Sequence, residues 1–213
     1  MVAGTSDTDW FDVVTWHAYT PWQETDAAST EIDALLAELG LEDKLFSMTE
    51  TGSSWDVNYD YRTDYPNSTD TQCADVWRLP LLGWAAGAAN VGWHTLTPLT
   101  DHAPTDEGTF HGYELIAWDG TWYPAAYSFQ LLTRELLPFR SVEQFPAEGR
   151  WWFRVVRTDL GVRWVGWGDG RVEVPDGVSA MTSVVPDASG NFTWTRVRAG
   201  DVVELSDIPI VLH

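Results

Sequence analysis

Short apolar runs alternate with amphipathic stretches through the first two thirds of the chain. The apolar runs are rich in aromatic and β-branched residues, which is typical of buried parallel strands. The stretches between them repeat apolar residues at helical spacing. The predicted strands are residues 10–17, 44–50 and 90–96, and the predicted helices are residues 29–39, 71–89 and 124–137. This order, with long loops after the strands, predicts an α/β fold with a parallel sheet.

From about residue 150 the hydrophobic positions change to a period of two, with glycine-rich turn signals between short runs. The predicted strands here are residues 152–156, 162–167, 171–174, 181–185 and 202–205. We therefore expect a partial (β/α) barrel of three strand–helix units at 10–140, followed by a small antiparallel β-sandwich module at 150–213. Residues 1–9 are expected to be a leader and residues 141–149 a join. The core of the module is expected to contain Trp152, Trp164 and Trp167.

Three strand–helix units cannot close a barrel that needs eight. An open three-stranded sheet would also leave two edges and its apolar faces uncovered. We therefore expect either a missing N-terminal barrel half or self-association to cover them. A homo-oligomer would be closed and symmetric, and a dimer is the simplest case.

The net negative charge of the chain excludes some classes of binding partner. The chain has 12 Lys plus Arg against 32 Asp plus Glu, a net charge of −20, and Lys44 is its only lysine. Such a field repels nucleic acid and anionic membranes. It suggests adaptation to high salt, the alternative being an acidic protein of ordinary surroundings. No apolar run is long enough for a membrane span, and the first residues lack a signal-peptide pattern, so the chain is expected to be soluble, either cytoplasmic or secreted with its targeting segment outside this sequence.

Three polar residues stand where parallel strands end. Glu50 closes the second predicted strand and Gly52 permits a sharp exit, at the end where barrel enzymes build their active sites. His17 and Tyr19 end the first strand and point the same way because the side-chain period is two. They could hydrogen-bond and orient a carboxylate. The alternatives are a solvated glutamate at a loop start and a histidine satisfied within the core.

These segments resemble, in order, the last three strands of the large clan of retaining (β/α)8-barrel glycoside hydrolases, families 39 and 5 above all. Residues 11–19 resemble the sixth strand, which ends in His-x-Tyr. Residues 45–52 resemble the seventh strand, whose terminal glutamate is the nucleophile. Gly92-Trp93 is similar to the eighth strand, where a tryptophan commonly forms the floor of the sugar-binding site.

The resemblance continues at residues 123–127, which look like the start of the last barrel helix, and at residues 205–211, which look like the final strand of a terminal β module. It spans nearly the whole chain. It implies Glu50 as nucleophile, His17 and Tyr19 as its catalytic companions, carbohydrate as the partner and no cofactor. The candidate substrate-binding aromatic residues are Trp93, Trp16, Trp22 and Trp55, with Tyr59, Tyr61 and Tyr65 near the same rim.

A retaining glycosidase needs two carboxyl groups about 5–5.5 Å apart. In this clan the acid/base glutamate follows an asparagine on the fourth strand, and the dipeptide Asn-Glu does not occur in this chain. The first hypothesis is therefore a truncated or split glycoside hydrolase that lacks its acid/base. The alternatives are a non-catalytic carbohydrate-binding protein and a structural, oligomeric remnant of a barrel.

Metal binding is not expected. A single cysteine, Cys73, allows no disulfide and no cysteine-based metal site. The alternating oxygens of residues 56–60 lack the glycine and distal glutamate of an EF-hand calcium loop. A histidine and aspartate group at 94–111 fits no standard zinc spacing; its members are His94, Asp101, His102, Asp106 and His111.

Overall fold

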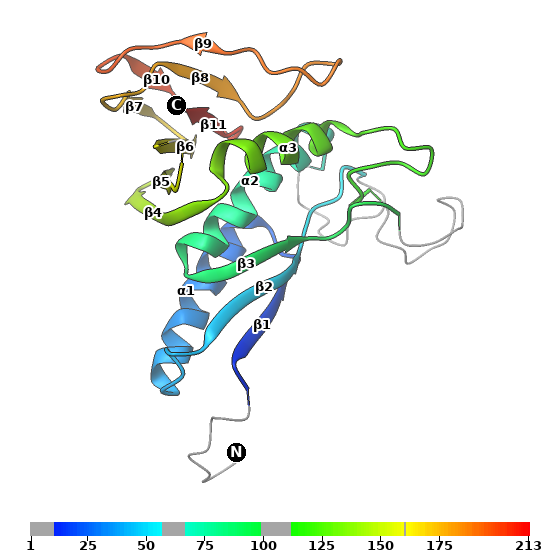
Figure 1. Ribbon diagram of the computed structural model, residues 1–213, viewed down its shortest axis with the longest axis vertical. Coiled ribbons are helices and arrows are strands. Elements are labelled where there is room, and N and C mark those ends of the chain that lie inside the picture. Colours follow the sequence, from blue (N-terminus) through cyan, green and yellow to red (C-terminus); the bar gives the residue numbers. More distant parts are fainter. Residues whose placement is uncertain (1–10, 57–66, 99–111, 160) are drawn as a thin grey trace.

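The structure is a computed structural model that describes residues 11–56, 67–98, 112–159 and 161–213. Figure 1 shows a parallel sheet with its helices and, stacked on them, a part made of antiparallel strands. The first part consists of β1 (Val13–Ala18), α1 (Trp22–Glu38), β2 (Leu45–Thr51), α2 (Thr69–Ala85), β3 (Ala88–Trp93) and α3 (Pro124–Leu136). The second part consists of β4 (Phe139–Ala147), β5 (Arg150–Arg157), β6 (Val162–Gly168), β7 (Arg171–Glu173), β8 (Ala180–Ser183), β9 (Thr195–Arg196), β10 (Val202–Glu204) and β11 (Ile210–Leu212).

The parallel sheet has the order β1-β2-β3, as the strand–helix alternation predicts. Helices cover one of its faces, where Leu36 of α1 packs with Phe46 of β2 and Ala88 of β3. Among the described residues, the other face is open. Its apolar residues Val13 and Leu45 are 43% and 57% exposed. Apolar side chains therefore face solvent on the side where a closed barrel would have its packed interior.

Helix α1 begins earlier than its sequence pattern indicates. A Ser-Thr-Glu signal predicts a start at residue 29, but the helix begins at Trp22, directly after Pro21, and Ser29 is buried within it. Helix α2 begins at the predicted place, with the Ser68 side chain accepting from the Thr71 N–H at 3.0 Å. It continues through Pro80, although a proline inside a helix removes one backbone hydrogen bond.

The antiparallel part contains one six-stranded sheet, ordered β4-β5-β6-β11-β8-β9, and a separate two-stranded ribbon of β7 and β10. The expected sandwich is thus, in the described residues, a large sheet faced by a short ribbon. The expected join at 141–149 is wrong, because β4 already occupies Phe139–Ala147. β4 is an edge strand, and an edge tolerates the proline at position 146 that obscures the strand pattern.

One continuous hydrophobic core joins the two parts. It includes Trp77 of α2, Leu132 of α3, Phe153 of β5 and Trp167 of β6, all buried. Trp167 is a core residue, as expected. Trp152 and Trp164 lie on the other face of the sheet, where they are half-buried against a second apolar cluster of the same module that includes Val174 and Leu212. No helix in the described ranges is apolar over a length that would cross a bilayer.

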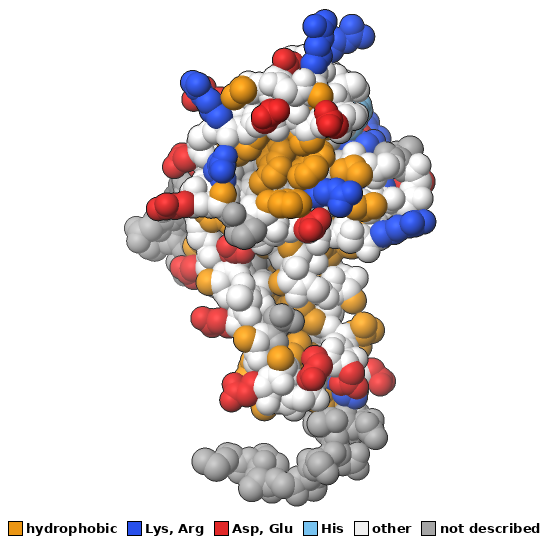
Figure 2. Space-filling model, turned by 90° about the vertical axis from the view of Figure 1, so that its left-hand side faces the viewer, with side chains coloured by type: hydrophobic (Ala, Val, Ile, Leu, Met, Phe, Trp, Pro, Cys, Tyr) orange, Lys and Arg blue, Asp and Glu red, His pale blue; other side chains and the backbone are white. Residues whose placement is uncertain are grey.

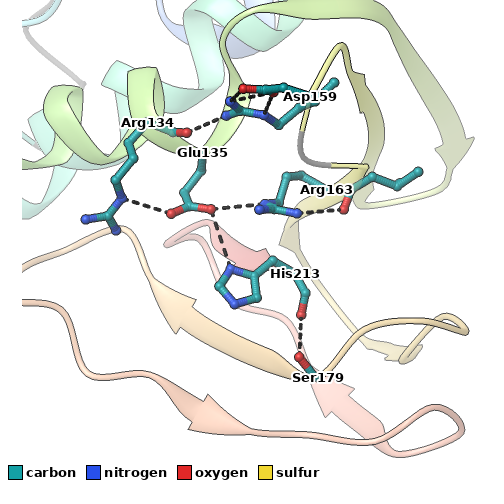
Figure 3. A network of polar contacts seen from close by, with 8 residues as sticks. Arg134, Glu135, Asp159, Arg163, Ser179 and His213 are labelled. Atoms are coloured by element: carbon teal, nitrogen blue, oxygen red, sulfur yellow. Dashed lines mark hydrogen bonds and ion pairs between the residues drawn. The ribbon is translucent and has the colours of Figure 1, made fainter.

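A polar network also ties α3 to the antiparallel sheet (Figure 3). The Glu135 carboxylate, with its side chain 7% exposed, accepts from Arg163 Nε of β6 and from Arg134 Nε, each at 3.0 Å. His213, which follows β11, places Nδ1 3.5 Å from the same carboxylate. Burial alone raises the pKa of Glu135, but the hydrogen bonds from Arg163 and Arg134 outweigh it and hold that pKa below its ordinary value.

Candidate functional site

A β-bulge in β2 decides which way Glu50 points. Phe46 and Met48 face the helices, so strict alternation would turn Glu50 to the helices as well. The register with β1 shifts at this point, because Trp16 pairs with Met48 but His17 pairs with Glu50. Thr49 is therefore an extra residue. The bulge turns Glu50 to the open face, beside His17.

Two glycines make room for this backbone path. A Cβ at Gly92 of β3 would lie 2.5 Å from the carbonyl oxygen of Thr49. A Cβ at Gly52 would lie 2.5 Å from the carbonyl oxygen of His94. In both places the obstacle is backbone, which cannot rotate aside. Only glycine therefore lets the bulge and the strand exit approach β3 so closely.

Glu50 is held by two side chains from the end of β1. Tyr19 Oη donates a hydrogen bond of 2.7 Å to Glu50 Oε2, and His17 Nδ1 lies 3.4 Å from the same oxygen. The His17 and Glu50 side chains are 54% and 40% exposed. The carboxylate is thus fixed through one oxygen while the group stays open to solvent on the uncovered face of the sheet. This is a suitable position for a nucleophile or a ligand-binding group.

Two further residues complete the group, and the sequence did not assign them to it. The Tyr19 ring makes edge contacts with His94 and Tyr113, each at a centroid distance of 5.9 Å. Burial lowers the pKa of His94; the Glu50 charge acts in the opposite direction and His17 adds to the lowering. The net shift favours a neutral imidazole. His94 directly follows β3, a position that could have indicated it, whereas Tyr113 lies 20 residues farther on and has no local signal.

Trp93 and Trp55 lie at the same end of the sheet. Trp93 pairs with Thr51, one position beyond Glu50, and its indole N–H donates to the Tyr113 carbonyl at 3.2 Å while the ring packs against the main core. Trp55 follows β2 and is half-buried, with its ring 5.5 Å from that of Tyr123. Trp55 remains a candidate for contact with a ligand, whereas the same role for Trp93 stays a prediction, because its ring packs against the main core.

Trp16 and Trp22 do not join this group, so their assignment to the rim is wrong. Trp16 alternates with His17 and stacks on Phe46, on the helix-covered face of the sheet. Trp22 is 6% exposed, because the early start of α1 places it in the core between the two parts of the molecule. There its ring meets Trp151 edge-on at 4.4 Å.

Within the described ranges no group of three or more His, Cys, Asp and Glu side chains is arranged to hold a metal ion. Most of the weaker sequence candidates lie outside those ranges. They are Asn58, Tyr59, Asp60, Tyr61, Tyr65, Asp101, His102, Asp106 and His111.

Comparison with known proteins finds the fold in glycoside hydrolases. No family model and no curated protein sequence matches the chain. Among solved structures, a family 39 glycoside hydrolase from Bacteroides cellulosilyticus WH2 is similar with a TM-score of 0.63 and 15% identity, over 86% of this chain and 37% of that one. A GH51 arabinofuranosidase from Xanthomonas axonopodis pv. citri is similar with a TM-score of 0.58 and 11% identity, over 97% of this chain and 53% of that one. A GH39 β-xylosidase from Caulobacter crescentus is similar with a TM-score of 0.54 and 12% identity, over 94% of this chain and 50% of that one. The chain therefore has the fold of part of these hydrolases and spans about half of their length or less.

Proposed function

We propose that this chain is a truncated or split glycoside hydrolase, a partial barrel that acts on carbohydrate with Glu50 as the nucleophile of a retaining mechanism. One observation carries the proposal. A glutamate at the end of the middle parallel strand is turned by a bulge toward the open face and held there by the Tyr19 hydroxyl at 2.7 Å. A bulge beside an active site commonly re-aims a functional side chain.

In the proposed reaction a Glu50 oxygen attacks the anomeric carbon, and the bond from that carbon to the leaving oxygen breaks. A carboxylic acid opposite Glu50 protonates the leaving oxygen, and its conjugate base then removes a proton from the water that releases the sugar. Tyr19 and His17 orient the nucleophile, and Trp93 and Trp55 are proposed to contact the sugar. The acid/base is proposed to lie on barrel strands outside this sequence.

The uncovered sheet face supports the same proposal. Val13 and Leu45 expose apolar surface, and His17 and Glu50 share that face. We propose that the missing barrel strands cover it, whether they belong to a longer form of this protein, to a partner chain or to a second copy. The net charge of −20 further suggests a high-salt setting, in which counterions screen the self-repulsion. Molecular mass measured over a range of salt concentrations tests both points.

Covalent trapping tests the role of Glu50 without an acid/base. The reagents are 2,4-dinitrophenyl 2-deoxy-2-fluoroglycosides of glucose and xylose and the corresponding arabinofuranoside. Dinitrophenolate leaves without protonation, so a lone nucleophile can still form the glycosyl–enzyme bond. We expect intact-mass spectra to show one added fluorosugar, which peptide mapping locates on Glu50.

Matched variants make the result specific. Glu50→Gln should form no adduct, and Glu31→Gln, a change to a glutamate on α1, should react as the wild type does. If the folded wild type gains no fluorosugar from any reagent, the nucleophile proposal is wrong. Sugar binding without an adduct would favour the non-catalytic carbohydrate-binding alternative, and absence of both would favour a structural remnant.

A further inference from the structure

The outer face of the six-stranded sheet carries three aromatic side chains, of which two tryptophans pack against a second apolar cluster that includes Val174 and Val203 beside the short ribbon. Along β5 and β6, Phe153 and Val165 face the core shared with the helices, while Trp152 and Trp164 lie on the opposite face and are half-buried. Phe145, on the edge strand β4, is 39% exposed. We call Phe145, Trp152 and Trp164 the aromatic platform. Figure 2 shows a hydrophobic patch in the antiparallel part of the molecule, bordered by acidic and basic side chains.

The rings of the platform are arranged in a regular way. Trp152 and Trp164 are 5.6 Å apart and nearly parallel, at 21°, and Phe145 lies 5.6 Å from Trp164 at 39°. Gly166 pairs with Trp152 across β5 and β6, and a Cβ on Gly166 would enter the Trp152 ring. The missing side chain thus lets this indole lie directly against the backbone of β6. The result is a stacked pair of indoles with the Phe145 ring tilted beside it.

The charges around the platform favour a neutral ligand. Arg154 is paired with Glu143 at 3.5 Å, and Arg150 donates to the Arg171 carbonyl at 2.7 Å. The cations nearest the rings are therefore already engaged. The net charge of −20 repels anionic polymers. The same arginine and glutamate side chains can still exchange hydrogen bonds with hydroxyl groups at the rim.

The aromatic side chains alone would supply only a small part of a protein interface. An aromatic side chain buries about 150–250 Å² when covered completely. Because these three are already more than half covered, they offer on the order of 200 Å² together. A stable protein interface needs roughly 800 Å² from each partner. A sugar ring needs far less, and it combines an apolar C–H face with hydroxyls around its edge.

We propose that the aromatic platform binds a neutral polysaccharide chain, with sugar rings stacked on Trp152 and Trp164. The platform is on the face of the sheet turned away from the core shared with α2 and α3, so barrel strands that complete the parallel sheet would leave it free. Binding here does not depend on Glu50. The platform would hold the protein on a polymer while a separate site performs any chemistry.

Retention on insoluble polysaccharides tests the proposal with the full chain. The probes are microcrystalline cellulose, insoluble arabinoxylan and curdlan. We expect the wild type to bind at least one of them, and Trp164→Ala and Trp152→Ala to bind at least tenfold more weakly. Phe145→Glu changes an exposed residue, so it tests the platform even if an indole replacement unfolds the protein. Circular dichroism identifies unfolded variants.

Two controls separate this site from the one at Glu50. Glu50→Gln should bind as the wild type does, because it leaves the platform unchanged. Trp118→Ala removes a tryptophan that is 53% exposed outside the platform, and it should also bind normally. No retention of the wild type on any probe, or equal retention of the folded Phe145→Glu and Trp164→Ala variants, overturns the proposal. A dimer that Phe145→Glu dissociates would overturn it as well.

Discussion

Replacing Gly92 with alanine tests whether the Thr49 bulge sets the direction of Glu50. The new Cβ would lie 2.5 Å from the Thr49 carbonyl oxygen and 3.3 Å from its carbonyl carbon. Both atoms are backbone, so no rotamer change relieves the contact. Either β2 and β3 separate locally or the bulge moves. In both cases Glu50 leaves its position 2.7 Å from the Tyr19 hydroxyl.

The expected loss of stability is moderate and the expected loss of reactivity is larger. Overpacking costs about 1–3 kcal/mol. At about 2 kcal/mol the melting temperature of a protein of this size falls by about 4–8 °C. A displacement of catalytic groups on the order of 1 Å can lower a rate by about a hundredfold. We therefore expect fluorosugar trapping on Glu50 to slow by at least tenfold in Gly92→Ala.

Gly83→Ala is the matched control. A Cβ at Gly83 of α2 would lie 2.9 Å from Met48 Cε and Val91 Cγ2, which are side-chain atoms and not backbone, and the Met48 side chain is flexible. Alanine also favours a helix interior over glycine by about 1 kcal/mol. We expect thermal unfolding and trapping close to wild type. The NMR shift of the His17 ring gives a readout that needs no substrate. Wild-type behaviour of Gly92→Ala in all three measurements would refute the role of the bulge.

Three further changes test the site and the core. Tyr19→Phe removes a hydrogen bond to a carboxylate worth about 1.5–3 kcal/mol, so we expect the melting temperature to fall by several degrees and trapping to slow by about tenfold or more; an unchanged rate would exclude Tyr19 as an orienting residue. Glu135→Gln removes the buried negative charge that Arg163 and Arg134 both contact, and it should cost about 3 kcal/mol in urea unfolding at neutral pH. The folded-state pKa of Glu135 is lowered, so the extra unfolding free energy of the wild type over Glu135→Gln should decrease as the pH falls below 4.5. If the unfolding free energies of the two proteins differ by the same amount at every pH, the proposed role of the network is wrong. Trp22→Ala should cost about 3–5 kcal/mol, and wild-type thermal unfolding would contradict its place in the core.

The order of elements could be predicted because each strand buries one face against a helix. Phe46 and Met48 alternate on β2, and the helices repeat apolar residues at their own period. The start of α1 was missed because Ser29, Thr30 and Glu31 look like an N-cap followed by an acidic first turn, whereas the helix extends back to Pro21 and its first residue, Trp22, packs in the core. Tertiary packing outweighed the local signal.

The direction of Glu50 could not be derived from alternation along β2. Alternation from Phe46 and Met48 would place the Glu50 side chain on the helix-covered face of the sheet. The extra residue Thr49 turns it to the opposite face. The cause lies in a neighbouring strand, at Gly92, and a local sequence pattern does not record that contact. The sequence prediction that His17 and Tyr19 could orient the Glu50 carboxylate came from their shared position at the ends of parallel strands, and the family resemblance pointed the same way.

Under the proposed function, the exposure of the site predicts that turnover requires further strands over the open face of the sheet. The side chains of His17 and Glu50 are 54% and 40% exposed, whereas a nucleophile gains most from fixed dipoles where water is excluded. Tyr19 can orient Glu50, but it cannot exclude water from the site. Strands that cover Val13 and Leu45 would bury the apolar face, exclude water around Glu50 and bring an acid/base opposite it in one step. We therefore expect trapping by the isolated chain to be slow, and the addition of those strands to accelerate it far more than any change to the residues already present.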